Sequence, residues 1–302
     1  MKVLIFGSSG QLGRDIVNAL STDHELICPD HEALSVESGK SIADCVSSTK
    51  PNTIINAAAF HDPEQCEAHP LQAFSVNALG PLYMSRAADA VGASFYHIST
   101  DYVFSGAQTR PYVESDLAAP LNVYGHSKLA GERFALAARA GGYVLRVGGL
   151  YGVHPCRGKR GRNFIRTMLM ASAGRPEVAV VDDELITPTA TVDVAQQLAC
   201  LMSLSLPPGI YHATAQGHCS WLEFARDIFT SLHLTTPLRA AQPSEFPLKT
   251  PRPQMSVLDN AALAAAGADI MPQWRDALRI FLARNEAIIS RWRTEAKSAV
   301  AR

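Results

Sequence analysis

The sequence predicts an α/β protein built on a doubly wound parallel sheet with a smaller α/β lobe, on three observations. Within residues 1–150, short apolar runs alternate with helix-length amphipathic stretches, which is typical of a parallel sheet with helices on both faces. The first apolar run ends in a glycine-rich turn. The 302 residues, 47% of them hydrophobic, are enough chain for a main domain and a smaller one.

Five apolar runs are the expected strands, and each is followed by a helix or loop signal. They are KVLIF (2–6), ELICPD (25–30), TIINAAA (53–59), SFYHIST (94–100) and YVLRVGG (143–149). After residue 150 we expect a helix at 164–174, a strand at 177–183, a helix opening near Thr191 and a C-terminal helix. The expected division is a main domain over 1–150 with a return at about 178–204, and the smaller lobe with the C-terminal helix over 151–177 and 205–302.

Composition limits the partners that the protein can have. Twenty-seven Lys and Arg against 28 Asp and Glu give a net charge of −1, so no overall positive field attracts nucleic acid or an anionic membrane. Six cysteines without a CxxC pair favour buried free thiols in a reducing compartment. No apolar run has the length of a signal-peptide core or a membrane span, and no histidine or cysteine cluster has metal-ligand spacing. We therefore expect a cytoplasmic protein without a metal.

The turn after the first strand carries glycines with GxxGxxG spacing. Gly7, Gly10 and Gly13 lie between the expected strand and the mouth of the first helix. Glycines there permit a tight turn and the close approach of a pyrophosphate, whose charge the amides at the helix N-terminus neutralise. The alternative is a purely structural turn. The context favours a Rossmann-type dinucleotide-binding domain whose first cofactor contacts are Gly7, Ser9, Gly10, Gln11, Leu12 and Gly13.

Asp30 stands at the end of the second expected strand, twenty residues after Gly10. An acid at this place binds the adenosine ribose hydroxyls and favours NADH over NADPH. It can equally cap the loop to HEALS, so the sequence leaves NADPH or NADH open as the cofactor.

The stretch NVYGHSKLAGE (122–132) opens a helix with Tyr124 four residues before Lys128. Residues at this spacing share one helix face. A free tyrosine has a pKa of about 10, and a nearby cation stabilises its phenolate and lowers that pKa toward the working range. The lysine can also hydrogen-bond a nicotinamide ribose. A tyrosine and a lysine on a solvated helix face would show the same spacing.

Upstream, the strand HIST ends at Thr100, and ligands of such sheets bind beyond the carboxyl ends of the strands. A hydroxyl there can donate to a carbonyl oxygen as charge develops on it. The order of glycine loop, strand-end hydroxyl and Tyr-x-x-x-Lys resembles the short-chain dehydrogenase/reductase superfamily.

Nearly the whole chain also resembles one family within it, the dTDP-4-dehydrorhamnose reductases. The matching blocks include AFSVNALGP, HISTDYVFSG, NVYGHSKLAGE, NFIRTMLMA, ITPTATVDVA and PRPQMSVLD. The resemblance implies NAD(P)H-dependent reduction of the 4-keto group of a dTDP-linked 6-deoxy sugar. It implies that Thr100 bonds the keto oxygen, Tyr124 donates the proton and Lys128 holds the ribose.

The resemblance also assigns the remaining site residues. Cofactor contacts are implied at Asn56, Ala57, Ala58 and Ala59, with Asn77 bracing that segment. Substrate contacts are implied at Thr100, Asp101, Tyr102, Gly149, Asn163 and Arg252, with Arg252 a candidate for the diphosphate. A nucleotide sugar is thus the expected partner, and a homodimer is a candidate assembly.

The departures from the family pattern concern the sugar. RVGGLYG replaces the common RTSWVYG, so Gly149 stands at a tryptophan position, and His61, Asp62 and Pro63 replace a different sequence after the alanines. Two other functions therefore compete. One is an epimerase that retains NAD, and the other is a non-catalytic, nucleotide-sensing subunit of the kind that regulates methionine adenosyltransferase.

Other candidates are weaker. Arg157, Lys159, Arg160 and Arg162 form a cationic loop that either clamps a diphosphate or is solvated. Trp221, Trp274 and Trp292 each lie in an amphipathic stretch, which favours packing.

Overall fold

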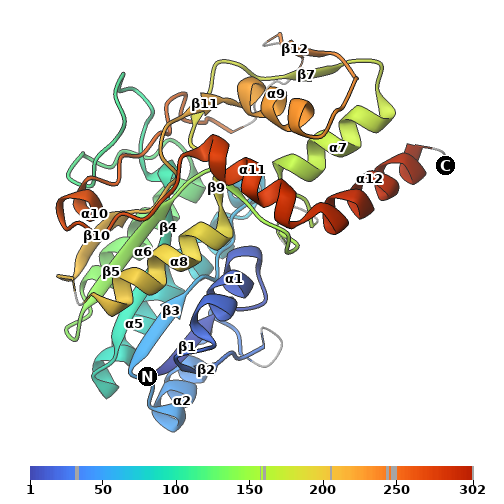
Figure 1. Cartoon of the computed structure of the whole chain (residues 1–302). Coiled ribbons are helices and arrows are strands. Elements are labelled where there is room, and N and C mark those ends of the chain that lie inside the picture. The colour runs from blue at the N-terminus through green and yellow to red at the C-terminus, as the bar shows by residue number, and fades with distance from the viewer. Residues whose placement is uncertain are drawn as a thin grey trace.

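A six-stranded parallel sheet forms the centre of the protein (Figure 1). The computed structural model describes residues 1–30, 34–156, 158, 161–204, 206–242, 245 and 250–300. The strands of the large sheet are β1 (Lys2–Phe6), β2 (Glu25–Ile27), β3 (Thr53–Asn56), β4 (Ser94–Thr100), β5 (Gly142–Val147) and β10 (Gly209–His212), in the spatial order β10-β5-β4-β3-β1-β2. Five of these were expected from the apolar runs, although β2 and β3 are each three residues shorter at the carboxyl end.

The strand order reverses between β1 and β3. The chain leaves β1 toward β2 on one side, and from β3 it continues through β4 and β5 on the other. Such a switch point opens a crevice beyond the carboxyl ends of the strands, where doubly wound proteins bind their ligands. The glycine turn that follows β1 and the alanines that follow β3 therefore meet at this crevice.

Helices cover both faces of the sheet. The helices of this domain are α1 (Gln11–Leu20), α2 (Gly39–Thr49), α3 (Pro63–Ala68), α4 (Pro70–Phe74), the π-helix η1 (Ser75–Leu79), α5 (Gly80–Val91), the 3-10 turn η2 (Asp101–Val103), α6 (Val123–Leu136) and α8 (Thr191–Ser203). On one face α1 and α8 pack side by side over residues such as Ile5 and Leu145, and on the other α2, α5 and α6 pack over residues such as Leu4 and Phe95. This alternation is what two-sided burial of a parallel strand requires.

A smaller lobe lies at the carboxyl end of the sheet, at the top of Figure 1. It contains α7 (Phe164–Gly174), α9 (Trp221–Ser231), α11 (Trp274–Arg284) and α12 (Glu286–Val300), with strands β7 (Val178–Val180) and β12 (Leu238–Ala240), which pair in parallel. Short strands β6 (Leu150–Tyr151), β8 (Leu185–Ile186), β9 (Thr189–Ala190) and β11 (Cys219–Ser220) join the lobe to the rest, and α10 (Ala261–Ala265) packs near β10. An aromatic cluster that includes Trp274 and Phe281 forms its core.

The expected return of the chain to the main domain, at about 178–204, contains β7, β8, β9 and α8. β7 pairs with β12 outside the large sheet, whereas β10, at 209–212, belongs to it. The segment that rejoins the main domain therefore runs through α8 and β10. Its short strand GIYH follows a proline pair, and prolines indicate a loop rather than a strand, so this strand was not predicted.

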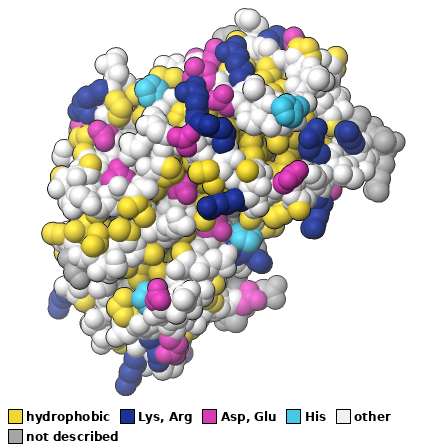
Figure 2. Space-filling model, viewed as in Figure 1, with side chains coloured by type: hydrophobic (Ala, Val, Ile, Leu, Met, Phe, Trp, Pro, Cys, Tyr) yellow, Lys and Arg dark blue, Asp and Glu magenta, His cyan; other side chains and the backbone are white. Residues whose placement is uncertain are grey.

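The surface shows no face of one charge in the view of Figure 2, where Lys and Arg side chains are interspersed with Asp and Glu. Among the residues that the structure describes, no helix has the length and apolar character that a membrane crossing needs.

Candidate active site

A cavity of about 760 Å³ lies at the carboxyl ends of the strands, between the main domain and the smaller lobe. Its walls come from the glycine turn, the segments after β3 and β4, the start of α6, and residues of the smaller lobe. Almost all predicted site residues line it: Gly7, Ser9, Gly10, Gln11, Leu12, Gly13, Ala57, Ala58, Ala59, Thr100, Asp101, Tyr102, Tyr124, Lys128, Gly149, Asn163 and Arg252. Among the described residues, three predicted ones do not: Asp30, Asn56 and Asn77.

The glycine turn leaves no room for side chains. Gly7 has φ +78, and a Cβ on it would lie 2.5 Å from the amide nitrogen of Ala58. A Cβ on Gly13 would lie 2.0 Å from the carbonyl oxygen of Gly7. The glycines thus let β1, α1 and the segment after β3 approach closely. The first amides of α1, which begins after the N-cap Gly10, face the cavity end, and such amides suit the pyrophosphate of a dinucleotide.

The three predicted residues outside the lining have different positions. Asp30 is exposed, three residues beyond the end of β2. Asn77 is buried in η1, and its amide bonds both the N–H and the carbonyl of Phe60, at 2.9 and 2.8 Å. It therefore fixes the segment after β3 from behind. Asn56 is also buried behind the cavity wall, where its Oδ1 accepts from the amide of Ala58 at 3.0 Å.

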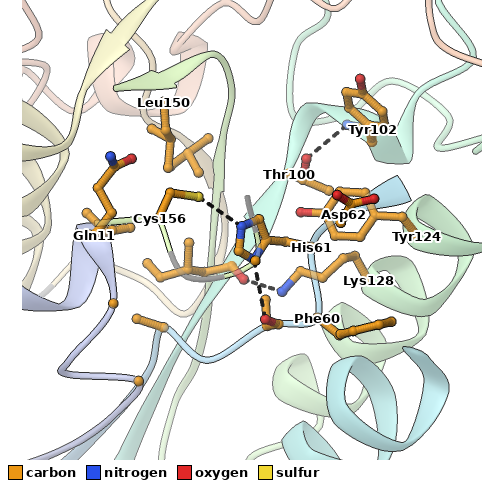
Figure 3. A pocket seen from close by; sticks show the side chains of 18 of the residues that line it. Gln11, Phe60, His61, Asp62, Thr100, Tyr102, Tyr124, Lys128, Leu150 and Cys156 are labelled. Carbon is orange, nitrogen blue, oxygen red and sulfur yellow. Dashed lines mark hydrogen bonds between the residues drawn. The ribbon is translucent and has the colours of Figure 1, made fainter. Parts of the chain in front are cut away.

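Helix α6 brings Tyr124 and Lys128 to the cavity. The helix begins after Asn122, whose side chain accepts from the amide of Gly125 at 2.8 Å. A Cβ on Gly125 would lie 2.2 Å from the carbonyl of Tyr102, so the first turn of α6 rests directly on η2. Because η2 begins right after Thr100, this contact brings Thr100 and Tyr124 together. Figure 3 shows Thr100, Tyr124 and Lys128 on one side of the cavity.

Burial dominates the electrostatics of this trio. Lys128 is 1% exposed, and desolvation lowers its pKa to about 7, although the negative charge of Glu132 acts in the opposite direction. Desolvation raises the pKa of the Tyr124 phenol, and a hydrogen bond with Thr100 offsets part of that rise. Both side chains are thereby biased toward their uncharged forms.

A buried ion pair lies behind the trio. Arg146 bonds both carboxylate oxygens of Glu132, at 2.9 and 2.7 Å, and Ser99 donates to the same carboxylate at 2.5 Å. Both charged side chains are at most 2% exposed. The pair ties α6 to β4 and β5, and so holds the helix that carries Tyr124 and Lys128.

The far end of the cavity is formed by charged and aromatic side chains. Arg252 bonds Glu64 of α3 at 2.7 Å, while its buried Nε has no hydrogen-bond partner among the described residues. Trp221 also lines the cavity and donates to Glu184 at 3.0 Å. The sequence assigned this tryptophan to packing, because its amphipathic pattern does not show that the helix start faces a cavity. Glu64, Glu184 and Phe164 were likewise not predicted.

Gly149 and Asn163 have backbone roles as well as positions in the lining. Gly149 has φ +58, and a Cβ on it would lie 2.3 Å from the carbonyl of Thr187. A tryptophan here would need a different course of the segment at 187–188. Asn163 caps α7 by accepting from the amide of Arg166 at 3.0 Å, and it donates to the carbonyl of Gly152 at 2.6 Å.

His61 lies across the middle of the cavity in Figure 3, with its Nε2 3.1 Å from the sulfur of Cys156. This contact connects the segment after β3 with the loop that leads into the smaller lobe. Of the predicted cationic loop, Arg162 lines the cavity, and Arg157, Lys159 and Arg160 lie outside the described residues.

Comparisons with known proteins identify the family of this chain. The model of the RmlD substrate binding domain family matches residues 1–287. The chain is 36% identical over 283 residues to the spore coat polysaccharide biosynthesis protein SpsK of Bacillus subtilis (strain 168), covering 93% of this chain and 96% of that protein. It is also 36% identical over 283 residues to the dTDP-4-dehydrorhamnose reductase of Streptomyces griseus, covering 91% of each.

Solved structures are similar over the same length. The crystal structure of a dTDP-4-dehydrorhamnose reductase from Clostridium acetobutylicum has a TM-score of 0.89 and 35% identity, covering 95% of this chain and 100% of that one. A dTDP-4-dehydrorhamnose reductase from Bacillus anthracis in complex with NADP has a TM-score of 0.88 and 32% identity, covering 94% and 99%.

The fold, the glycine turn and these relatives define an NAD(P)-dependent oxidoreductase of the extended short-chain dehydrogenase/reductase type. Within that class the chain belongs to the RmlD substrate binding domain family and is a nucleotide-sugar reductase.

Proposed function

We propose that this protein reduces the 4-keto group of a dTDP-linked 6-deoxy sugar, as in the dTDP-4-dehydrorhamnose reductase reaction, with NADPH or NADH. The observation that carries the proposal is the grouping of Thr100, Tyr124 and Lys128 in a cavity that continues to the glycine turn. Relatives named dTDP-4-dehydrorhamnose reductase support the choice of sugar nucleotide.

The reduced nicotinamide, when bound, supplies the hydride that reaches the keto carbon. The protein residues supply the proton and position the substrate and the cofactor. Thr100 donates a hydrogen bond to the keto oxygen as negative charge develops there. Tyr124 transfers its phenolic proton to that oxygen, which leaves a phenolate that regains a proton from water. Lys128, one helical turn away, holds the cofactor ribose beside Tyr124.

The nucleotide ends of both ligands also have candidate contacts. The amides that follow Gly10 suit the cofactor pyrophosphate. The half-buried guanidinium of Arg252 suits the diphosphate of the sugar nucleotide, because its buried Nε has an unused hydrogen-bond donor. Trp221 and Phe164, with ring centroids 4.6 Å apart, offer apolar surface to the remainder of the nucleotide sugar.

The test follows NADPH and NADH absorbance with dTDP-4-keto-6-deoxy-L-mannose as acceptor. We expect oxidation of the cofactor by the wild type, and a loss of about 100-fold or more in kcat for Tyr124→Phe, within the usual range for general acid catalysis. Thr100→Ser should retain most of the activity and Thr100→Val should lose it, because only serine keeps the hydroxyl.

No oxidation by protein that binds the cofactor would contradict the proposal. Conversion of the sugar without net redox change, by protein that purifies with bound NAD, would indicate an epimerase instead. Binding without any turnover would indicate a nucleotide-sensing protein.

A further inference from the structure

A chain of buried hydrogen bonds connects the cofactor-side wall to Lys128 through His97. His97 lies in β4 and is 0% exposed. Its Nδ1 is 3.1 Å from the side-chain Nδ2 of Asn56, and its Nε2 is 3.2 Å from Nζ of Lys128. Lys128 in turn donates to the carbonyl of Ile98 at 2.5 Å. Each ring nitrogen of His97 therefore faces one side-chain nitrogen, that of Asn56 or that of Lys128.

A hydrogen bond outside the Asn56–His97–Lys128 series fixes the orientation of the Asn56 side-chain amide. Its Oδ1 accepts from the amide N–H of Ala58 at 3.0 Å. An amide rotated by 180° would place its NH₂ group against this N–H, and both groups would then be donors. Asn56 consequently presents a donor to Nδ1 of His97, so Nδ1 must be the acceptor and carry no proton.

The state of Lys128 follows from that of His97. A neutral imidazole without a proton on Nδ1 carries it on Nε2, where it points at Nζ of Lys128. An ammonium group has only donors and would oppose this proton, whereas an uncharged amine has a lone pair that accepts it. With a neutral Lys128, every polar atom from Ala58 to Ile98 has a complementary partner.

Thr100 and Tyr124 fit the same state. The hydroxyl of Thr100 donates to Asp101 at 2.9 Å. In this state the proton of Thr100 is directed at Asp101. A phenolate at Tyr124 would need that proton turned toward its own oxygen, and that turned bond is the one that lowers the pKa of Tyr124.

We propose that in the cofactor-free enzyme His97 is the Nε2–H tautomer, that it donates to an uncharged Lys128, and that this state keeps Tyr124 a phenol. The proposal rests on the proposed function in one respect: a phenol is the proton donor that reduction requires. His97 is thus a positioning residue, which acts on Tyr124 only through Lys128.

The surroundings of Lys128 favour the uncharged amine. Desolvation lowers the pKa of Lys128, and burial together with the lysine charge lowers the pKa of His97. The negative group that acts on Lys128 is Glu132, and Arg146 neutralises it with two hydrogen bonds. The next titratable group on the same face of α6 is Tyr124, which is itself uncharged in this state.

Nuclear magnetic resonance tests the protonation states without any substrate. The full-length, cofactor-free chain would be labelled with ¹⁵N at its 10 histidines and ¹³C at its seven lysines. His97→Gln and Lys128→Met identify the two signals. At pH 8 we expect His97 protonated at Nε2 alone and Lys128 as the free amine. An Nδ1–H tautomer, or an ammonium at Lys128, would overturn the proposal.

Asn56→Asp should reverse the donor and acceptor roles along this series of hydrogen bonds. A carboxylate accepts from both Ala58 and His97, so the imidazole should become the Nδ1–H tautomer and leave Nε2 to accept from a charged Lys128. The titration of Lys128 should then move upward, toward the value of about 10.4 of an ordinary lysine. Asn52→Asp, the same change at an exposed position, is the matched control and should leave both signals unchanged.

Kinetics give the second readout. A charged Lys128 stabilises the phenolate, so in Asn56→Asp the fall of kcat at high pH should begin at a lower pH than in the wild type. A purely structural role would lower kcat equally at every pH, and that result would overturn the catalytic part. Absence of turnover in the wild type would refute the proposed function, while the tautomer measurement would still decide the hydrogen-bond chain.

Discussion

At the scale of single residues, solvent exclusion decides which protons the site holds. Tyr124 and Lys128 share a helix face, as their spacing predicts, and a charged lysine beside a tyrosine would favour the phenolate. In this chain Lys128 is buried, with a pKa lowered to about 7. Above that pH the uncharged amine leaves the pKa of Tyr124 high, and below it an ammonium lowers that pKa, while Tyr124 remains a phenol in both cases. A reductase needs the phenol, and the site therefore holds its proton donor on both sides of neutral pH.

Arg252 is the residue with the clearest consequence for substrate affinity. Arg252→Met removes the charge and the unused Nε donor but keeps an apolar stem of similar length. Because hydrogen bonds to charged groups are worth about 1.5–3 kcal/mol, we expect KM for the nucleotide sugar to rise about 10- to 100-fold. The measurement is steady-state kinetics with the sugar varied at saturating cofactor.

Arg239→Met provides the control for Arg252. Arg239 also pairs with glutamates, Glu177 and Glu245, but on the surface of the smaller lobe. Its removal should leave KM for the nucleotide sugar unchanged. Equal effects of the two substitutions would rule out a diphosphate contact at Arg252.

At the scale of elements, the glycine turn joins β1, α1 and the segment after β3. Gly13→Ala would place a methyl group 2.0 Å from the carbonyl of Gly7, so α1 would have to shift away from the turn. Overpacking of this kind costs about 1–3 kcal/mol, and we expect cofactor affinity to fall about tenfold or more. Fluorescence titration with NADPH and urea unfolding measure the two effects.

The matched control for the turn is Gly209→Ala in β10. A Cβ at Gly209 meets no atom within 4 Å, so neither stability nor cofactor affinity should change. If Gly13→Ala bound NADPH as tightly as the wild type, the turn would not be the pyrophosphate site.

The elements also show what a sequence can and cannot disclose. Strands β1 and β4 and helix α7 coincide with their patterns, because two-sided burial and a helical repeat are local properties. Asn56 and Asn77 were placed by the family resemblance near the cofactor, but their hydrogen bonds depend on His97 and Phe60, which no spacing relates to them. Trp221 has the pattern of a packing residue. Its place in the cavity depends on contact between segments more than a hundred residues apart.

At the scale of the whole molecule, the chain passes repeatedly between the two parts. It leaves the main domain after β6, returns through α8 and β10, and leaves again for α9, α11 and α12. Each passage fixes one part to the other. Such interleaving opposes the independent unfolding that separate domains show.

This connectivity predicts one unfolding transition. All three tryptophans, Trp221, Trp274 and Trp292, lie in the smaller lobe, so their fluorescence reports that lobe, whereas far-ultraviolet circular dichroism reports the whole chain. We expect the two urea curves to coincide. NADPH, which binds the folded state alone, should raise both midpoints equally. Separate midpoints would show that the lobes unfold independently.

The same return through α8 and β10 has a meaning for how such enzymes can diversify. Because α8 packs beside α1 on the sheet and β10 completes the sheet beside β5, the part that binds the sugar is not one continuous segment of the chain. A graft of residues 151–300 from a relative with another specificity would also replace α8 and β10, which belong to the sheet layers of the recipient's main domain. New sugar preferences are therefore more accessible by point substitutions along the cavity wall, such as those at His61 and Gly149, than by recombination of whole lobes.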